Sequence, residues 1–405
     1  MGSDWSVLWA ACGAAGLTGR RDGPPLDVPV GVVRLATELA VSIGEVSGRL
    51  GRAIDLDGPE LLGERAAMTG LARTGDVSCG GATRLLHAAD GWLAVSLARD
   101  EDIAAVPAWL EVSMPDDGHE RWAAIADVVA RRPSNEIVER GVLLGLPIAR
   151  RAEVRMSADA APATWRQVSG ASARRRPLDD AVVIDLSSLW AGPLAASILG
   201  LAGARVITVE SVHRPDGARS GSAAFFDLLH VGSESVCLDF RNSADVAALR
   251  RLLEKSDVVI EASRPRALAH LGLDRDTVLG PRVWASITGH GRVGPAADRI
   301  GFGDDAAVAG GLVAVDATGP CFVVDAVADP LTGLAAADAV LGRFEAGGSW
   351  HLDLSLARTA AIAATPAITD IGSHTLAPPR GRAAVGRAPT LGAHTDAVLD
   401  EFARR

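Results

Sequence analysis

The chain has 405 residues, of which 48% are hydrophobic and 22% charged, and its formal net charge is −10. This composition is typical of a globular protein with two or three domains and excludes disorder as the default state. Because the negative charge is spread without long acidic blocks, nucleic acid and anionic membranes are not the expected partners. Small molecules are the expected ligands.

Charged residues interrupt every apolar stretch before it could span a bilayer, and no run has the features of a signal peptide. We therefore expect a cytoplasmic protein without a membrane partner. The four cysteines, Cys12, Cys79, Cys237 and Cys321, lie far apart and show no metal-ligand spacing. Buried free thiols are expected rather than disulfides or zinc, and no metal is expected.

Residues 1–75 resemble a later part of the same chain. Gly16-Leu17 aligns with Gly311-Leu312, Pro25 with Pro320, Leu39 with Leu334, and the closing IDLD with LDLS. We interpret residues 1–75 as a partial repeat of the second half of the large domain described below, with chance similarity as the alternative. Arg34 stands where the later copy has Asp329, so the first copy lacks that carboxylate.

Residues 76–150 predict a smaller α+β domain. A Gly-rich segment leads into two short strands around the turn at 89–91, and helical periodicity follows near 121–131 and 134–140. Residues 151–178 are rich in Ala, Arg and Ser and contain two prolines, which is typical of a linker.

From residue 179 to residue 405 the pattern is that of a large α/β domain with a C-terminal tail. Strands are predicted at 181–187, 204–211, 235–240, 257–263 and 282–289, and helices at 194–203 and 243–255 with Ser243 as N-cap. Strands that are apolar on both faces and alternate with helices predict a doubly wound, mostly parallel, Rossmann-like sheet. Ligands of such sheets bind at the carboxyl ends of the strands.

A nicotinamide-dependent dehydrogenase is one class with this fold. Glu210 ends the second predicted strand, where a ribose-binding acid would lie. However, the turn after the first strand reads SSLWAGP and lacks the G-x-G-x-x-G that brings backbone close to a pyrophosphate. No nicotinamide is therefore expected.

Asp329 lies at a predicted strand-to-helix junction, in the stretch VVDAVADPLTG. At the start of a helix, unpaired backbone N–H groups and the helix dipole favour an ionised carboxylate, which suits a nucleophile at neutral pH. The alternative is an ordinary N-cap followed by Pro330 at the first helical position.

Residues 179–355 resemble the large domain of the class III CoA-transferases, the CaiB/BaiF family. The resemblance rests on PLDDAVVIDLSSLWAGPLAASILGLAGARVITVES, SVCLDF, DVVIEASRPRALAHLGL, ASITGHGRVGPAADRIGFGD, VADPLTG and WHLDLSL, with RAPTLGAHTDAVL as the tail. The DGWLAVSL region is similar to the family's small domain. The family's order begins with the first half of the large domain, so this chain resembles a permuted or partially duplicated member.

The resemblance implies an acyl-CoA:carboxylate CoA-transferase that uses coenzyme A as acyl-CoA co-substrate and a carboxylic acid as acceptor. It implies that Asp329 forms an anhydride and then an aspartyl-CoA thioester, and that the chain is a homodimer. The same fold includes acyl-CoA racemases, but Phe302 stands where they carry a proton-transferring His. A non-catalytic acyl-CoA-binding relative is the remaining alternative.

The family pattern also indicates residues for CoA and for a covering loop. The CoA candidates are Leu189, Trp190, Leu238, Arg241, Ser263, Arg264 and His270. The arginines could pair with nucleotide phosphates or be solvated loop charges. Cys79, Gly80 and Gly81 could cover the site or merely lead into a hairpin. Ser211 and Ser233 to Ser235 replace basic residues of the family.

Overall fold

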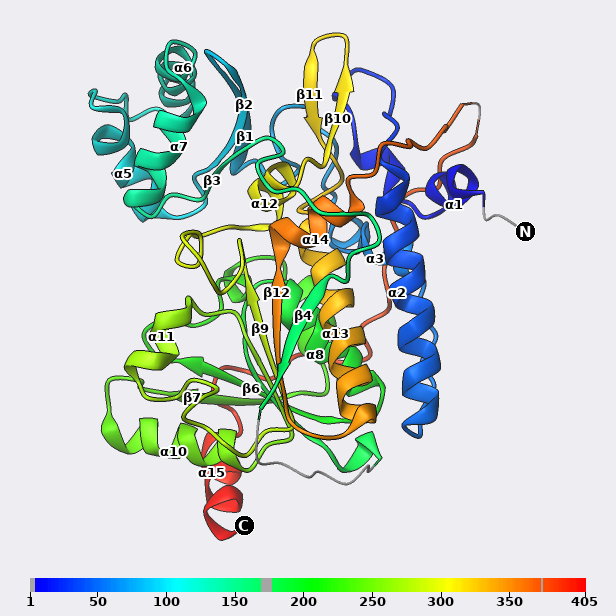
Figure 1. The fold of residues 1–405 in the computed structure, drawn as a ribbon, viewed down its shortest axis with the longest axis vertical. Helices are drawn as coiled ribbons and strands as arrows, with labels where there is room; N and C mark the ends of the chain where they lie inside the picture. Colours follow the sequence, from blue (N-terminus) through cyan, green and yellow to red (C-terminus); the bar gives the residue numbers. More distant parts are fainter. Residues whose placement is uncertain (1–3, 169–176, 373) are drawn as a thin grey trace.

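A seven-stranded sheet forms the centre of the computed structural model, which describes residues 4–168, 177–372 and 374–405. The strand order is β4-β12-β9-β8-β5-β6-β7 (Figure 1). Its strands are β4 (Ala163–Gln167), β5 (Val182–Leu186), β6 (Arg205–Ser211), β7 (Glu234–Leu238), β8 (Val258–Glu261), β9 (Val283–Thr288) and β12 (Trp350–Ser355). All neighbours pair in parallel except β4, which is antiparallel to β12. The predicted α/β class and doubly wound, mostly parallel sheet are confirmed.

Helices cover both faces of this sheet because its strands present apolar side chains alternately to each side. Val183 and Ala285 pack toward one layer, and Ile184 and Trp284 pack toward the other. The first layer contains α8 (Ala191–Leu201), α13 (Ala328–Ala346) and α14 (Leu356–Ala363), and the second contains α10 (Ser243–Glu254), α11 (Pro265–His270) and α15 (Thr395–Arg404). Asn242, not Ser243, is the N-cap of α10, since its side chain accepts from the N–H of Ala244.

The chain reverses direction across the sheet at β5. From β5 it continues outward through β6 to β7, and it then returns to β8 on the opposite side of β5. The loops that follow β5 and β8 therefore flank the topological switch point, where ligands of doubly wound sheets bind. Segments 187–190 and 262–264 form these loops.

The residues predicted as a small domain form a separate antiparallel sheet with its own core. Its strands are β1 (Thr83–Ala88), β2 (Gly91–Ser96) and β3 (Ile148–Arg150), and its helices are α5 (Asp100–Leu110), α6 (Gly118–Val129) and α7 (Ser134–Leu143). One face packs on these helices, and Leu85 and Ala94 pack on α12 (Gly303–Ala309) and the hairpin β10 (Val313–Asp316) and β11 (Gly319–Phe322). The predicted hairpin around 89–91 is confirmed.

The N-terminal segment is helical and packs against the large sheet's helices (Figure 1). It contains α1 (Trp5–Ala11), the 3₁₀ turn Ala15–Leu17, α2 (Val30–Arg49), α3 (Gly58–Leu61) and α4 (Glu64–Thr69). The remaining elements of the large domain are α9 (Ala223–His230) and the 3₁₀ turns Leu178–Asp180 and Gly217–Ser220. Residues 54–57 (IDLD), all described, form no strand, whereas LDLS, with which they align, lies in β12, so the two aligned segments differ in structure. In the second copy the aligned residues form β12, which pairs with β9 and β4.

The interval predicted as a linker, 151–178, contributes β4 to the edge of the large sheet, and its residues 169–176 lie outside the described parts. This short strand is mostly exposed, so its sequence carries no apolar alternation to reveal it. The four cysteines are free, with Cys12 and Cys321 buried and Cys79 and Cys237 partly so. Across the described ranges, no helix combines the length and apolar character that crossing a membrane requires.

Candidate active site

Asp329 is the second residue of α13 and follows a turn with unusual backbone geometry. Val324 and Ala326 have left-handed φ values of 59° and 45° on either side of Asp325. This conformation is disfavoured for β-branched Val, and such geometry clusters at functional sites. Val327 occupies the N-cap position, so the N-cap alternative for Asp329 is wrong.

The carboxylate of Asp329 lies against the backbone at the start of α12. A Cβ at position 303 would stand 2.4 Å from Oδ2 of Asp329, so only Gly303 permits this approach. The next residue, Asp304, accepts a hydrogen bond from the N–H of Ala326 at 3.0 Å. The start of α12 and the turn before α13 thus enclose Asp329 together.

Three carboxylates share this region with one guanidinium. Asp325 is fully buried, and Arg65 of α4 donates to it twice, at 2.6 Å from Nε and 2.5 Å from Nη2. The Arg65 guanidinium also lies over the Trp190 ring, 5.2 Å from its centroid. Asp304 and Asp329 interact electrostatically with the same arginine. Arg65 is therefore the charge that makes this acidic cluster tolerable.

The pKa of Asp329 is raised to about 7, mainly by burial, while Arg65 lowers it and the neighbouring Asp304 and Asp325 add to the rise. Burial likewise raises the pKa of Asp304 to about 6, and Asp325 adds to this effect. Burial among like charges therefore opposes the ionised form that the start of the helix favours. Near pH 7 Asp329 is balanced between its two protonation states.

The loop of Cys79, Gly80 and Gly81 lies against the turn that leads into α13. Cys79 Sγ donates to the carbonyl of Val324 at 3.3 Å, and a Cβ at Gly80 would stand 3.5 Å from Nη2 of Arg65. Burial, with Asp325 and Asp304, raises the pKa of the Cys79 thiol. The loop also leads into β1, so the structure fits both alternatives for it, and its neutral thiol is suited to packing rather than to nucleophilic attack.

Of the residues predicted for CoA, Trp190 contacts this cluster through Arg65. It is buried at the start of α8, in contact with Arg65. One turn after Asp329, Gly333 packs so closely on α8 that a Cβ there would stand 2.8 Å from the carbonyl of Ala191. Leu189 precedes Trp190 with a left-handed φ of 70° and an exposed side chain.

Ser263 and Arg264 follow β8 on the other side of the switch point, and His270 ends α11. The side chains of Arg264 and His270 are exposed. Leu238 instead ends β7, the edge strand two positions from β5, and Arg241 follows it. Leu238 is buried in the core, which suits a packing role as well as a contact through its backbone. The predicted CoA residues thus fall into two groups along one edge of the sheet.

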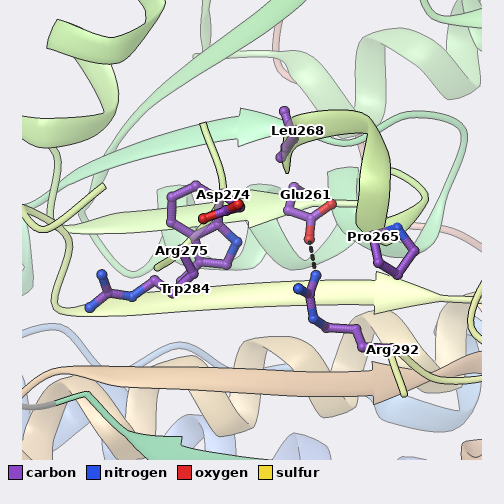
Figure 2. A pocket seen from close by; sticks show the side chains of 7 residues that line it. All are labelled: Glu261, Pro265, Leu268, Asp274, Arg275, Trp284 and Arg292. Atoms are coloured by element: carbon purple, nitrogen blue, oxygen red, sulfur yellow. Dashed lines mark hydrogen bonds and ion pairs between the residues drawn. The ribbon is translucent and has the colours of Figure 1, made fainter. Parts of the chain in front are cut away.

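A narrow hollow lies beside the loop after β8 (Figure 2). An ion pair of 3.2 Å between Glu261 and Arg292 crosses it, and Arg292 also donates to Ser286 at 3.1 Å. Its lining residues are Glu261, Pro265, Leu268, Asp274, Arg275, Trp284 and Arg292. This pair anchors the loop after β9 to the carboxyl end of β8.

Sequence reasoning missed Arg65, Asp304 and Asp325. Asp304 ends one of the stretches that carried the family resemblance, and Asp325 lies in the stretch VVDAVADPLTG together with Asp329, so their place in the sequence was a signal. Arg65 has no motif and is 260 residues from Asp325, so nothing local indicates it. Phe302, which replaces the racemase His, caps α12, and its ring faces the Arg99 guanidinium at 5.7 Å.

Fold and site together define an α/β protein with a buried carboxylate at the start of a helix beside a doubly wound sheet. Residues 178–395 match the model of CoA-transferase family III, which is more than half of the chain. The chain belongs to this family, and the predicted membership is confirmed.

Relatives of known name are CoA-transferases. The chain is 33% identical over 208 residues to the succinate–glutarate CoA-transferase of Agrobacterium fabrum, covering 45% of this chain and 52% of that protein. It is 30% identical over 200 residues to the succinyl-CoA:glutarate CoA-transferase of Mus musculus, covering 45% of each. A CaiB/BaiF family structure from Brucella suis matches with 31% identity and a TM-score of 0.43, over 46% of this chain and 55% of that one. The chain spans about half the length of these relatives.

Proposed function

We propose that this chain is an acyl-CoA:carboxylate CoA-transferase in which Asp329 is the covalent nucleophile. The observation that carries the proposal is the position of Asp329, enclosed at the start of α13 within the segment that matches the family. The names of the relatives support CoA transfer as the reaction. As for the family, we also propose a cytoplasmic homodimer.

In the proposed reaction, the ionised Asp329 carboxylate attacks the thioester carbonyl of the donor acyl-CoA. The C–S bond breaks, which gives a mixed anhydride and the CoA thiolate. The thiolate then attacks the Asp329 carbonyl, releases the donor carboxylate and leaves an aspartyl-CoA thioester. The acceptor carboxylate repeats these steps in reverse, so acceptor acyl-CoA leaves and the Asp329 carboxylate is restored.

The surroundings of Asp329 suit these steps. Asp329, which is partly buried, lies against the backbone of Gly303, and Cys79 contacts Val324 in the turn before α13. Excluding water protects an anhydride and a thioester from hydrolysis. Arg65 favours the ionised form of Asp329, which is the nucleophilic form. The chain thus supplies both the attacking group and the charge that activates it.

We propose that CoA binds along the carboxyl ends of the strands, with its nucleotide near Arg264 and Arg241. Among the described residues, Arg264 has no ion-pair partner. Replacing Arg241 or Arg264 with Ala should weaken CoA binding by about 1.5 to 3 kcal/mol for each charged hydrogen bond lost. Titration calorimetry with CoA measures this effect. Arg266→Ala, which removes a neighbouring arginine paired with Asp298 at 3.2 Å, is the matched control. Unchanged affinity in both test variants would exclude this assignment.

Intact-protein mass spectrometry tests the function directly. After incubation with a panel of acyl-CoAs, the protein should gain the mass of CoA less one water, since the Asp329 thioester forms with loss of that water. Treatment with hydroxylamine should remove the adduct, because hydroxylamine cleaves thioesters. If calorimetry shows tight CoA binding but no acyl-CoA yields an adduct or exchange, the non-catalytic alternative replaces the transferase.

A further inference from the structure

The small domain contains a second hollow that does not share residues with the site around Asp329. It has a volume of about 310 Å³ and lies between β1 and α6. The side chains that matter for its chemistry are Arg84, His87, Trp92, His119 and Trp122. A cavity of this size with two indoles, two imidazoles and a guanidinium has the mixed apolar and polar lining of a ligand site.

Arg84 gives this hollow its charge. Its guanidinium lies over the ring of Trp122, 4.7 Å from the centroid, and its buried Nε has no hydrogen-bond partner. Burial lowers the pKa of Arg84, and Asp76 opposes this effect only in part. The acid on the same wall, Asp76, is held by Arg20 at 3.2 Å. Within the described residues Arg84 has no ion-pair partner, so an anion is the ligand group that it lacks.

The helix α6 does not itself supply the anion site, although it begins beside the hollow. Asp117 accepts hydrogen bonds from the N–H groups of His119 and Glu120, at 2.8 and 2.9 Å, so the first turn is already capped. The atom without a hydrogen-bond partner is Nε of the Arg84 guanidinium. Its planar N–H donors match the two oxygens of a carboxylate.

Aromatic rings supply the rest of the lining. Trp92 meets His87 edge to face, with ring centroids 5.0 Å apart, and Trp122 lies under Arg84. Flat apolar surfaces of this kind favour a planar aromatic body by stacking. We propose that this hollow binds an aromatic carboxylate, with its carboxylate on Arg84 and its ring against the two indoles.

Titration calorimetry of the full chain with benzoate tests this site. Benzoate should bind, while benzamide, which has the same shape without the charge, should bind at least about tenfold more weakly, as loss of a charged hydrogen bond requires. Cyclohexanecarboxylate keeps the charge without the flat ring and should also bind more weakly. No heat with benzoate at millimolar concentration, or equal binding of benzamide, would overturn the proposal.

Variants then assign the binding to residues. Arg84→Gln should lose benzoate affinity at least about tenfold, and Arg84→Lys should retain part of it because the charge remains. Arg131→Gln is the matched control, since Arg131 lies just beyond α6, exposed and paired with Asp127. If Arg84→Gln melts at a much lower temperature, Trp122→Leu replaces it as the test. Full affinity in the test variant would overturn the assignment.

A last variant tests whether benzoate binds in this hollow or at Asp329, where the acceptor acid of the proposed reaction would bind. Asp329→Asn should bind benzoate as the wild type does, because Asp329 is not part of the lining. Loss of benzoate binding in this variant would place the aromatic acid at Asp329 and overturn the proposal of a second site. Failure of CoA exchange in the wild type leaves the benzoate test unaffected, so the two proposals can fail separately.

Discussion

Replacing Asp329 with Asn should abolish exchange of CoA between carboxylic acids. An amide can form neither the mixed anhydride nor the aspartyl thioester, so the covalent route is lost entirely. The measurement is transfer of labelled CoA between two acids, together with the adduct mass. Asp338→Asn, a change of the same kind further along α13, is the control that should retain exchange. Normal exchange in the Asp329→Asn variant would refute the proposed nucleophile.

The same variant should be more stable than the wild type above pH 7. The folded-state pKa of Asp329 is raised from 3.8 to about 7, so between these values the folded protein binds more protons than the unfolded chain. Wild-type stability is therefore lost as pH rises through this window. The Asn variant lacks this loss, and its advantage at pH 8 should reach at most about 4 kcal/mol, from about three pKa units at 1.36 kcal/mol each.

Thermal melting between pH 4 and pH 9 checks this second effect. The melting temperatures of the two proteins should converge near pH 4 and separate as the pH rises. A constant difference across the whole range would show that Asp329 is not strained by burial among carboxylates. Melting and exchange measurements together distinguish a nucleophile whose burial lowers the stability of the protein from a side chain with a merely structural role.

The sequence predicts Asp329 at the start of a helix because a short apolar run, Pro330 and a helical period lie together there. It does not predict the pKa of Asp329, which depends on Asp304, Asp325 and Arg65 coming together in three dimensions. Of these, Arg65 comes from α4 in the N-terminal segment. Charge partners that meet only after folding leave no local pattern, so their effect cannot be anticipated.

The same limit applies to the fold. Strands such as β5 and β8, apolar on both faces, are evident from the sequence, whereas the exposed edge strand β4 is not. Over its first part, from Gly16 to Leu39, the proposed repeat aligns positions 295 apart. In the structure, Ser42 donates to Asp338 at 2.5 Å and Arg49 to Glu345 at 2.7 Å, pairs that are 296 apart.

These contacts mean that α2 and α13 lie side by side in nearly matched register (Figure 1). We propose that two copies of one unit pack on each other within this chain. In this arrangement only the second copy holds the carboxylate. The first contributes α4, and with it Arg65, to the site.

Replacing Arg65 with Met should shift the pH dependence of CoA exchange to higher pH. Because Arg65 lowers the pKa of Asp329, its loss should raise that pKa from about 7 by about one unit, as an opposite charge at close range typically does. At pH 7 the ionised fraction, and with it kcat/KM, should then fall by up to about tenfold. The acid limb of a profile of kcat/KM against pH measures the shift.

A variant of Asp325, the ion-pair partner of Arg65, should shift the pKa of Asp329 in the opposite direction. Asp325→Asn removes a carboxylate that raises the pKa of Asp329, so its acid limb should move to lower pH. Arg65→Met alone leaves Asp325 buried and unpaired, which costs about 3 to 5 kcal/mol and could prevent folding. The double variant removes both charges, so it should fold better than Arg65→Met and bring the acid limb back toward that of the wild type. If neither Asp325→Asn nor the folded Arg65 variants move the limb, the charges around Asp329 do not set its ionisation, and the nucleophile must be activated in another way.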